Sequence, residues 1–193
     1  MTIVRAGVLA LQGDVREHAA ILESLGAEVV RVRRPEDLEG IDALVIPGGE
    51  STTIGKLADR YGMVEPLRRA ITGGLPTLGT CAGMIFLAAS TTETRSQVQL
   101  GVLDVVVRRN AFGGQVESSE RELVVEGIDG PVLAVFIRAP WIEKVGEGVE
   151  VLAEVDDHPV MVREGNVIAT SFHPELVGDS RVHRALLAMV EGA

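Results

Sequence analysis

The first half of the chain alternates short apolar runs with amphipathic segments, and this alternation constrains the fold more than any other feature. The apolar runs lie at 3–11, 27–32, 42–47 and 75–80, and helical spacing of apolar residues follows the first, third and fourth of them. Strands that alternate with helices form parallel sheets, because each helix returns the chain to the edge where the next strand starts. The sequence therefore predicts an α/β fold with a central, mostly parallel sheet flanked by helices.

The expected helices have recognisable ends. The segment 13–26 has Asp14 as a candidate cap, Glu17 three places later as in a capping box, and Gly26 at its end. The segment 48–62 turns tightly and enters a helix for which Ser51 or Thr52 is the expected cap. Two further helices are expected at 64–72 and 82–90.

From residue 101 the pattern changes to strand-like runs separated by short turns that contain Gly or Asp. They are expected to extend the sheet with antiparallel strands and to add hairpins at its edge, and they lie at 102–110, 122–127, 132–140, 149–156, 159–165 and 166–172. A terminal helix is expected at 180–192, and the polar stretch 90–99 reads as an exposed connection. Nothing marks a linker or an internal repeat, so we expect one domain over residues 1–193.

Charge and cysteine content exclude several classes of protein. The formal net charge of −10 argues against a nucleic-acid binder, which needs a basic face to displace counterions. No apolar run approaches the ~18 residues of a membrane helix, and the N-terminus lacks the pattern of a signal peptide. A single cysteine cannot form an internal disulfide, which favours a reducing, cytoplasmic location.

That cysteine, Cys81, stands in "GTCAG" between an expected strand and an expected helix. This is the form of a nucleophile elbow with cysteine in place of serine, in which a strained backbone leaves room only for small neighbours such as Gly79 and Gly83. The position before a helix also favours the thiolate. A buried core cysteine is the alternative reading, and the flanking glycines count against it.

A thiolate nucleophile needs a base and a group that orients the base. His173 follows the apolar run 166–172 and is expected to emerge at a strand end, with Glu175 two residues later. Residues i and i+2 of extended backbone point to the same side, and Pro174 keeps this segment out of a helix. Glu175 can therefore orient His173 toward Cys81. The remaining histidines are expected elsewhere: His18 and His183 on solvated helix surfaces, and His158 in a turn.

A third motif, "PGGES" at 47–51, follows the expected strand 42–47. Ligands bind where parallel strands end, so this loop and the Cys81 loop are expected to face each other. Backbone N–H groups of Gly48, Gly49 and Ala82 can then form an oxyanion hole. An ordinary glycine turn before a helix is the alternative interpretation.

Together "GTCAG", "PGGES" and "SFHPE" resemble the class I (triad) glutamine amidotransferases. Within these, "LALQGDVREH", "PGGESTTI", "RRNAFGGQV", "VFIRAP" and "TSFHPEL" are similar to the glutaminase subunits of pyridoxal 5'-phosphate synthase, over nearly the whole chain. The resemblance implies a flavodoxin-like class I amidotransferase fold and hydrolysis of L-glutamine to glutamate and ammonia, without a cofactor or metal of its own. It also implies a (β/α)8-barrel synthase partner that uses the ammonia in vitamin B6 biosynthesis, with no nucleic acid or membrane involved.

The resemblance also assigns residues. Cys81, His173 and Glu175 match the catalytic triad, and Gln12 matches a position near the oxyanion region. The residues that match the glutamine pocket are Gly49, Glu50, Ser51, Arg109, Ile137 and Arg138. An arginine suits the α-carboxylate of glutamine, whereas a surface ion pair is the ordinary alternative for Arg109 or Arg138.

Three other functions compete with this assignment. The glutaminase subunit of another amidotransferase, such as imidazole glycerol phosphate synthase, would share the triad, although "LQGDVREH" and "GGESTTI" favour the vitamin B6 group. A cysteine hydrolase of γ-glutamyl peptides is a second enzyme class. A degenerate subunit that only binds its partner is the non-enzymatic alternative, and the intact triad counts against it.

Overall fold

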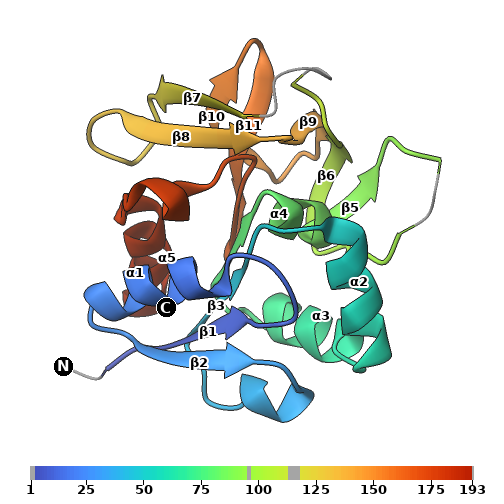
Figure 1. The fold of residues 1–193 in the computed structure, drawn as a ribbon, viewed down its shortest axis with the longest axis vertical. Coiled ribbons are helices and arrows are strands. Elements are labelled where there is room, and N and C mark those ends of the chain that lie inside the picture. The colour runs from blue at the N-terminus through green and yellow to red at the C-terminus, as the bar shows by residue number, and fades with distance from the viewer. Residues whose placement is uncertain (1–2, 95–96, 113–117, 193) are drawn as a thin grey trace.

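The structure is a computed structural model that describes residues 3–94, 97–112 and 118–192. Its centre is a seven-stranded sheet in the order β10-β11-β12-β4-β3-β1-β2, seen in Figure 1. Five neighbouring strands run parallel and two antiparallel strands extend them at one edge. The parallel strands are β1 (Arg5–Leu9), β2 (Glu28–Val32), β3 (Ala43–Ile46), β4 (Thr77–Thr80) and β12 (Val167–Thr170), and the antiparallel ones are β10 (Glu150–Val155) and β11 (His158–Glu164).

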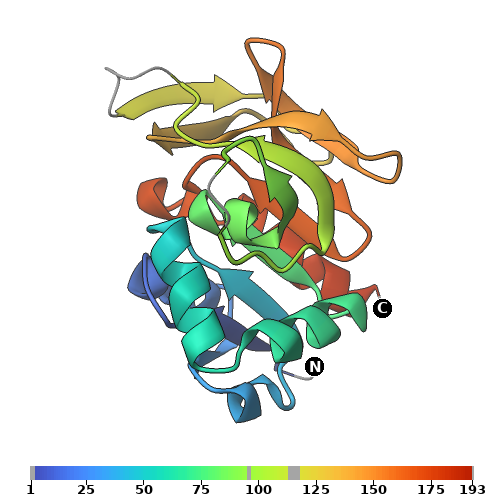
Figure 2. The ribbon, with the colours of Figure 1, turned by 90° about the vertical axis from the view of Figure 1, so that its right-hand side faces the viewer.

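Helices cover both faces of this sheet, as Figures 1 and 2 show. The helices are α1 (Val15–Ser24), α2 (Ser51–Arg60), α3 (Val64–Thr72), α4 (Ala82–Leu87) and α5 (Arg181–Glu191), with short 3₁₀ turns η1 (Pro35–Leu38) and η2 (Pro174–Val177). Within β3, Leu44 and Ile46 join the core shared with α2, α3 and α4, whereas Ala43 and Val45 join the core shared with α1 and α5. Successive residues of β3 thus face opposite sides of the sheet, as expected for a strand that is buried on both faces.

Two small sheets complete the described part of the chain. One has the order β5-β6-β9 and the other pairs β7 with β8, with bounds β5 (Ala88–Thr91), β6 (Leu103–Arg108), β9 (Trp141–Val145), β7 (Ser118–Leu123) and β8 (Val132–Ile137). The expected α/β class, with a mostly parallel sheet and added antiparallel strands, is confirmed. Four details of the expectation are wrong. The helix 82–90 ends at Leu87 and continues as β5, and β9 was not foreseen. The strand expected at 122–127 is β7, which ends at Leu123, and β12 lies inside the parallel sheet rather than extending it.

The expected helix caps are also wrong in detail. Asp14 occupies the cap position of α1, but its side chain makes no capping hydrogen bond. Helix α2 is capped by Glu50, whose carboxylate accepts from the backbone N–H groups of Thr52 and Thr53, and not by Ser51 or Thr52. A carboxylate at a helix start is favourable because it pairs with the free N–H groups and the positive end of the dipole.

Two of the sequence features fall partly outside the described residues. They are the end of the "RRNAFGGQV" motif, at 113–116, and positions 95–96 of the polar connection. Among the residues that the structure describes, no helix has the length and apolar character needed to cross a membrane.

Candidate active site

Four adjacent parallel strands end at the same edge of the sheet and bring the predicted site residues together. In the order β12-β4-β3-β1, these strands are followed by His173, Cys81, the Gly48–Gly49 loop and the loop that holds Gln12. The carboxyl ends of parallel strands are where α/β proteins bind ligands. The spatial order thus joins segments that lie far apart in sequence.

Cys81 has the strained backbone of a nucleophile elbow. Its φ is 48° and its ψ is −103°, in a region that residues with a side chain rarely adopt, and it stands directly before α4. A Cβ on Gly79 would lie 2.4 Å from Leu87 Cδ1, and one on Gly83 would lie 2.1 Å from the carbonyl oxygen of Ile46. The flanking glycines therefore allow the sharp turn and the close approach of α4 to β3.

His173 and Glu175 are both buried, and His173 Nδ1 lies 2.6 Å from Glu175 Oε1. Burial opposes the charged form of His173, but hydrogen bonds with Asp14, Cys81 and Glu175, and the charge of Cys81, outweigh it and raise the pKa to about 12. Burial raises the pKa of Glu175, against the opposing pull of His173. A raised pKa of His173 favours the imidazolium form of this ring.

Asp14 supplies a second carboxylate that the sequence reading missed. Its Oδ2 lies 3.4 Å from His173 Nδ1, so the side chain that was expected to cap α1 faces the catalytic histidine instead. The strand order contains the signal, because the loop after β1 must adjoin the loop after β3. An acidic residue in that loop falls next to the site.

The Gly48–Gly49 loop is packed tightly against this group. A Cβ on Gly48 would lie 2.4 Å from His173 Cε1. The N–H of Gly48 donates to Thr80 Oγ1 (3.0 Å), and its carbonyl accepts from the N–H of Asp14 (3.1 Å). In this conformation the Gly48 N–H, one of the three expected oxyanion donors, is therefore engaged within the protein.

Gln12 reaches the same loop. Its Oε1 accepts the N–H of Glu50 at 2.8 Å, and a Cβ on Gly49 would lie 2.3 Å from that oxygen. Gly49 has a φ of 154°, which favours glycine. The structure thus places Gln12, Gly49 and Glu50 side by side.

Arg109 faces the start of α2. Its guanidinium lies 3.4 Å from both Glu50 Oε1 and Gln97 Oε1, and Gln97 also accepts from the Ser51 hydroxyl at 3.4 Å. Burial works against the charge of Glu50, yet hydrogen bonds from Thr53 and Thr52 prevail and lower its pKa to about 2. An arginine beside a carboxylate that stays ionised can hold both charged ends of an amino acid. Gln97 was not singled out from the sequence.

Ile137 and Arg138 lie at the end of β8, which is joined to the site through a hydrogen bond from the His173 N–H to the carbonyl of Val135 (2.9 Å). Arg138 is exposed and has a φ of 43°, an unusual conformation for a residue with a side chain. The structure brings this pair to the border of the site. It records no hydrogen bond from the Arg138 side chain to a residue in the described part of the chain.

The expectation for two other histidines is wrong. His18 and His183 are fully buried rather than solvated, and the ring of His18 on α1 contacts the ring of His183 on α5. Their burial depends on the packing of two helices from opposite ends of the chain, which no local pattern reveals. His158 lies at the start of β11, where it stacks on Trp141 with ring centroids 3.7 Å apart.

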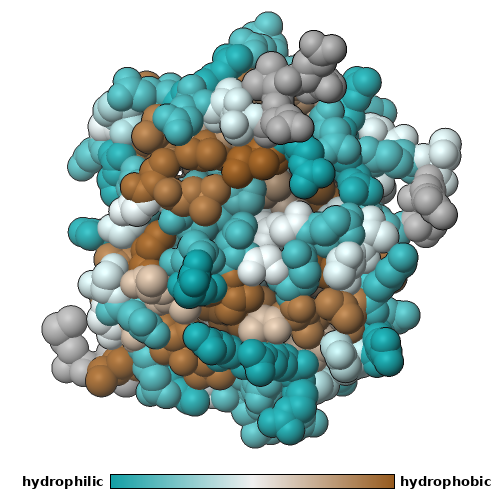
Figure 3. Space-filling view, in the orientation of Figure 1, coloured by the Kyte–Doolittle hydropathy of each residue, from teal (hydrophilic) through white to brown (hydrophobic). Residues whose placement is uncertain are grey.

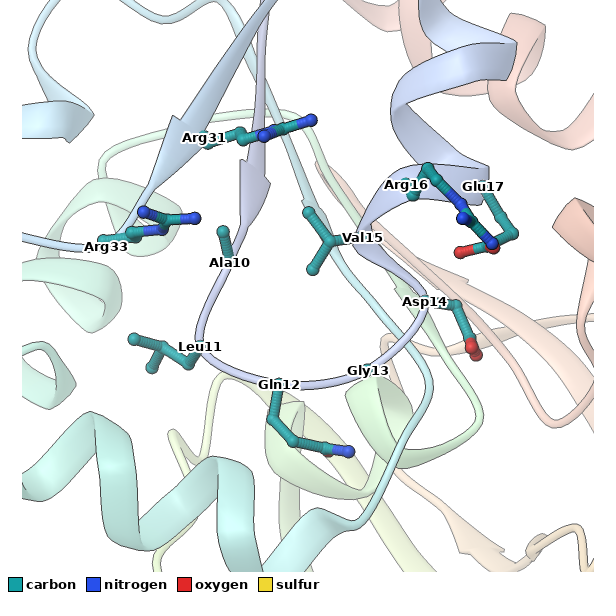
Figure 4. A pocket seen from close by; sticks show the side chains of 10 residues that line it. All are labelled: Ala10, Leu11, Gln12, Gly13, Asp14, Val15, Arg16, Glu17, Arg31 and Arg33. Carbon is teal, nitrogen blue, oxygen red and sulfur yellow. The ribbon is translucent and has the colours of Figure 1, made fainter.

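A cavity of about 560 Å³ lies against the loop after β1 (Figure 4). Figure 4 shows Leu11 and Arg33 on one side of this loop, with the side chains of Gln12 and Asp14 directed away from them. Gln12 and Asp14 line this cavity and also contact the site, through Glu50 and His173 respectively.

Asp14, His173 and Glu175 are also the one group of potential metal ligands found in the described ranges. Two ligands of a tetrahedral zinc ion, each about 2.1 Å from it, lie roughly 3.4 Å apart. The 2.6 Å between His173 Nδ1 and Glu175 Oε1 is shorter and suits a shared proton.

Comparison with known proteins agrees with this geometry. The family model of the SNO glutamine amidotransferases matches residues 8–192. A protein of Parafrankia sp. (strain EAN1pec) named pyridoxal 5'-phosphate synthase subunit PdxT is 60% identical over 192 residues, covering 98% of this chain and 95% of that protein. A protein of Frankia alni with the same name is 57% identical over 191 residues, covering 98% and 96%.

A solved crystal structure of a glutamine amidotransferase is similar in fold and sequence. Its TM-score is 0.92 at 55% identity, and the match covers 96% of this chain and 98% of that one. The fold class and the resemblance expected from the motifs are thereby confirmed. The chain belongs to the SNO glutamine amidotransferase family.

Proposed function

We propose that the chain is the glutaminase subunit of a pyridoxal 5'-phosphate synthase, in which it hydrolyses L-glutamine to glutamate and ammonia at Cys81. The observation that carries the chemistry is the meeting of a strained Cys81 with the hydrogen-bonded pair His173–Glu175 at one sheet edge. The vitamin B6 role rests on relatives named PdxT at 57–60% identity over nearly their whole length. The proposal treats residues 1–193 as a single amidotransferase domain.

The reaction has two steps. The Cys81 thiolate attacks the side-chain carbonyl carbon of glutamine, and the His173 imidazolium gives its proton to the departing nitrogen, so ammonia leaves and a thioester remains. Neutral His173 then takes a proton from the water that attacks the thioester, and breaking the C–S bond restores the thiolate. Glu175 orients the imidazole and stabilises its charge throughout.

The remaining residues bind and orient the substrate. Arg109 and Glu50 hold the α-carboxylate and the α-amino group, and Ile137 and Arg138 close the pocket beside η2. The N–H groups of Ala82 and of the Gly48–Gly49 loop stabilise the oxyanion. The partner is a synthase subunit, for which we propose a (β/α)8 barrel that receives the ammonia. A thiol nucleophile must stay reduced, which supports a cytoplasmic location.

Replacement of Cys81 tests the proposal. Cys81→Ala should abolish glutamate formation from glutamine in the presence of the synthase, because the attacking atom is gone. The circular dichroism spectrum should be unchanged, since alanine fits the small-residue elbow. His173→Asn should be nearly as inactive and Glu175→Gln milder, because the latter keeps the base. Wild-type activity in Cys81→Ala would refute the function.

A further inference from the structure

Two fully buried histidines lie directly behind the triad, although the mechanism above does not use them. His18, on α1, and His183, on α5, come from opposite ends of the chain, and Figure 1 shows the two helices next to each other. His18 Nδ1 lies 2.8 Å from His183 Nε2. On the other edge of the ring, His18 Nε2 lies 3.1 Å from Thr80 Oγ1 and 3.5 Å from Glu175 Oε1.

His18 is neutral at physiological pH. Burial, together with the nearby His183 and His173, holds the pKa of His18 well below its usual value. A neutral imidazole carries one N–H, and the Glu175 oxygen, which already accepts from His173, favours that hydrogen on Nε2 rather than a lone pair facing it. His18 Nδ1 is then the acceptor, and the proton between the two rings belongs to His183 Nε2.

This arrangement joins two parts of the site. Thr80 Oγ1 accepts the N–H of Gly48, and Glu175 accepts from His173 Nδ1. The Nε2–H of His18 faces both Thr80 and Glu175, so one buried ring supports the oxyanion loop and the group that orients the base. Positioning within a fraction of an ångström matters here, because misplacement by ~1 Å costs about 10²-fold in rate.

We propose that His18 is a positioning residue for glutamine hydrolysis, which aligns Glu175 and Thr80 through its Nε2–H while His183 fixes its tautomer. This inference rests on the proposed function, since it assumes that His173 and Glu175 work with Cys81. The groups that face the ring are Glu175 and His173 from the segment after β12, Thr80 from β4 and His183 from α5.

Two amide substitutions separate the two edges of the ring. In His18→Gln the side-chain nitrogen can occupy the place of Nε2, which keeps a donor for Glu175 and Thr80 and gives up the contact with His183. In His18→Asn the amide lies near the place of Nδ1, which keeps the contact with His183 and gives up the donor. Both introduce a buried amide, so their stability costs are similar, and Leu22→Ala removes packing from the same buried face of α1 as a control.

The measurements are kcat and KM for glutamine with the synthase present, the rate at which iodoacetamide alkylates Cys81 at neutral pH, and the melting temperature. Cys81 is the only cysteine in the chain, so alkylation reports on this thiol alone.

His18→Asn should lower kcat by about 10- to 100-fold, as expected for losing a hydrogen bond to a charged group, with KM little changed. Its alkylation should also slow, whereas His18→Gln should stay near wild type in both. Leu22→Ala should melt earlier with normal kcat.

Equal kcat in His18→Gln and His18→Asn, or losses that simply follow the melting temperature as in Leu22→Ala, would overturn the inference and leave His18 a core residue. The proposed function fails separately. If Cys81→Ala still hydrolyses glutamine, the function itself is wrong. If Cys81→Ala is inactive while His18→Asn keeps the wild-type kcat, only the role of His18 is wrong.

Discussion

At the scale of single residues, the site requires glycine at position 48 as specifically as it requires a thiol at Cys81. A Cβ at this position would lie 2.4 Å from His173 Cε1 and 2.9 Å from Nδ1. We expect Gly48→Ala to lower kcat by about 100-fold or more, because the added methyl group would displace the ring of His173 from its catalytic position. Steady-state assays of glutamate formation check this. Gly148→Ala is the matched control, since its Cβ would meet nothing closer than 3.6 Å, and equal activity of both variants would contradict the argument.

Arg109 allows a test of substrate binding. Among the residues that the structure describes, its guanidinium makes only long contacts of 3.4–3.5 Å, with Glu50, Thr52 and Gln97. Its side chain is 30% exposed, so it can turn to a carboxylate. Arg109→Ala should raise KM for glutamine more than it lowers kcat, because the α-carboxylate is held equally in the ground and transition states. The neighbouring Arg108→Ala is the control, since Arg108 pairs with Glu143. A loss confined to kcat would place Arg109 in the chemical step instead.

The site residues that could be predicted from the sequence differ physically from those that could not. Cys81, His173 and Glu175 carry local marks, since the glycines around Cys81 and the proline after His173 constrain the backbone itself. His18 and Asp14 carry none, because their positions on a helix and at its cap suggest solvent and capping roles. Only the packing of α1 against α5 and the adjacency of β1 to β3 bring them to the site.

At the scale of elements, the strands and helices with a single clear period were predictable and the mixed ones were not. Helix α3 has the predicted bounds, and strand β3 is a fully buried apolar run. The run "AGMIFLAAS" fits a helix and a strand equally well, and it is both, as α4 followed by β5. Strand β9 has two consecutive charged residues, Glu143 and Lys144, and lies at a sheet edge, so its pattern was too weak to find.

The contact between α1 and α5 predicts how stability depends on pH. Burial holds the pKa of His183 at about 4, below its usual 6.5, despite the opposing charge of Asp179. Between these two pKa values, His183 is protonated in the unfolded chain and neutral in the folded chain. Lowering the pH through this range therefore reduces the free energy of unfolding by up to about 3 kcal/mol. His183→Asn should therefore reduce the slope of unfolding free energy against pH by up to about 1.4 kcal/mol per unit within the window from pH 6.5 to 4.5.

Denaturant unfolding at several pH values checks this expectation. Acidic groups such as Glu50 and Glu175 are present in both proteins, so the difference between the two slopes reports on His183 and on its coupled partner His18. Leu186→Ala is the control, because it removes buried packing from the same helix without removing a titratable group. An unchanged slope in His183→Asn would mean that His183 titrates alike in the folded and unfolded chains.

At the scale of the whole molecule, the site edge adjoins an apolar surface. Figure 3 shows apolar residues gathered over the region of β8, and the exposed large apolar side chains include Val124, Leu133 and, on η2, Leu176. Apolar groups left at the surface beside a site suit contact with another protein. This supports docking of the synthase across the edge that holds His173 and Cys81.

Docking at that edge leads to the prediction for the complex. In the isolated chain the Gly48 N–H is engaged with Thr80, and the Gly48 carbonyl is held by the N–H of Asp14. Turning the Gly48 N–H away from Thr80 would break the first bond, at a net cost of about 1 kcal/mol, and would free this donor for the oxyanion beside that of Ala82. Glycine at both positions permits the turn.

One added oxyanion donor is worth on the order of 10²-fold in rate. We therefore expect the chain alone to be a weak glutaminase, with kcat rising about 100-fold on addition of the synthase while KM for glutamine changes little. Glutamate formation with and without the synthase measures this directly. A purified chain that is already fully active, and that the synthase does not accelerate, would mean that the oxyanion hole is formed without the partner.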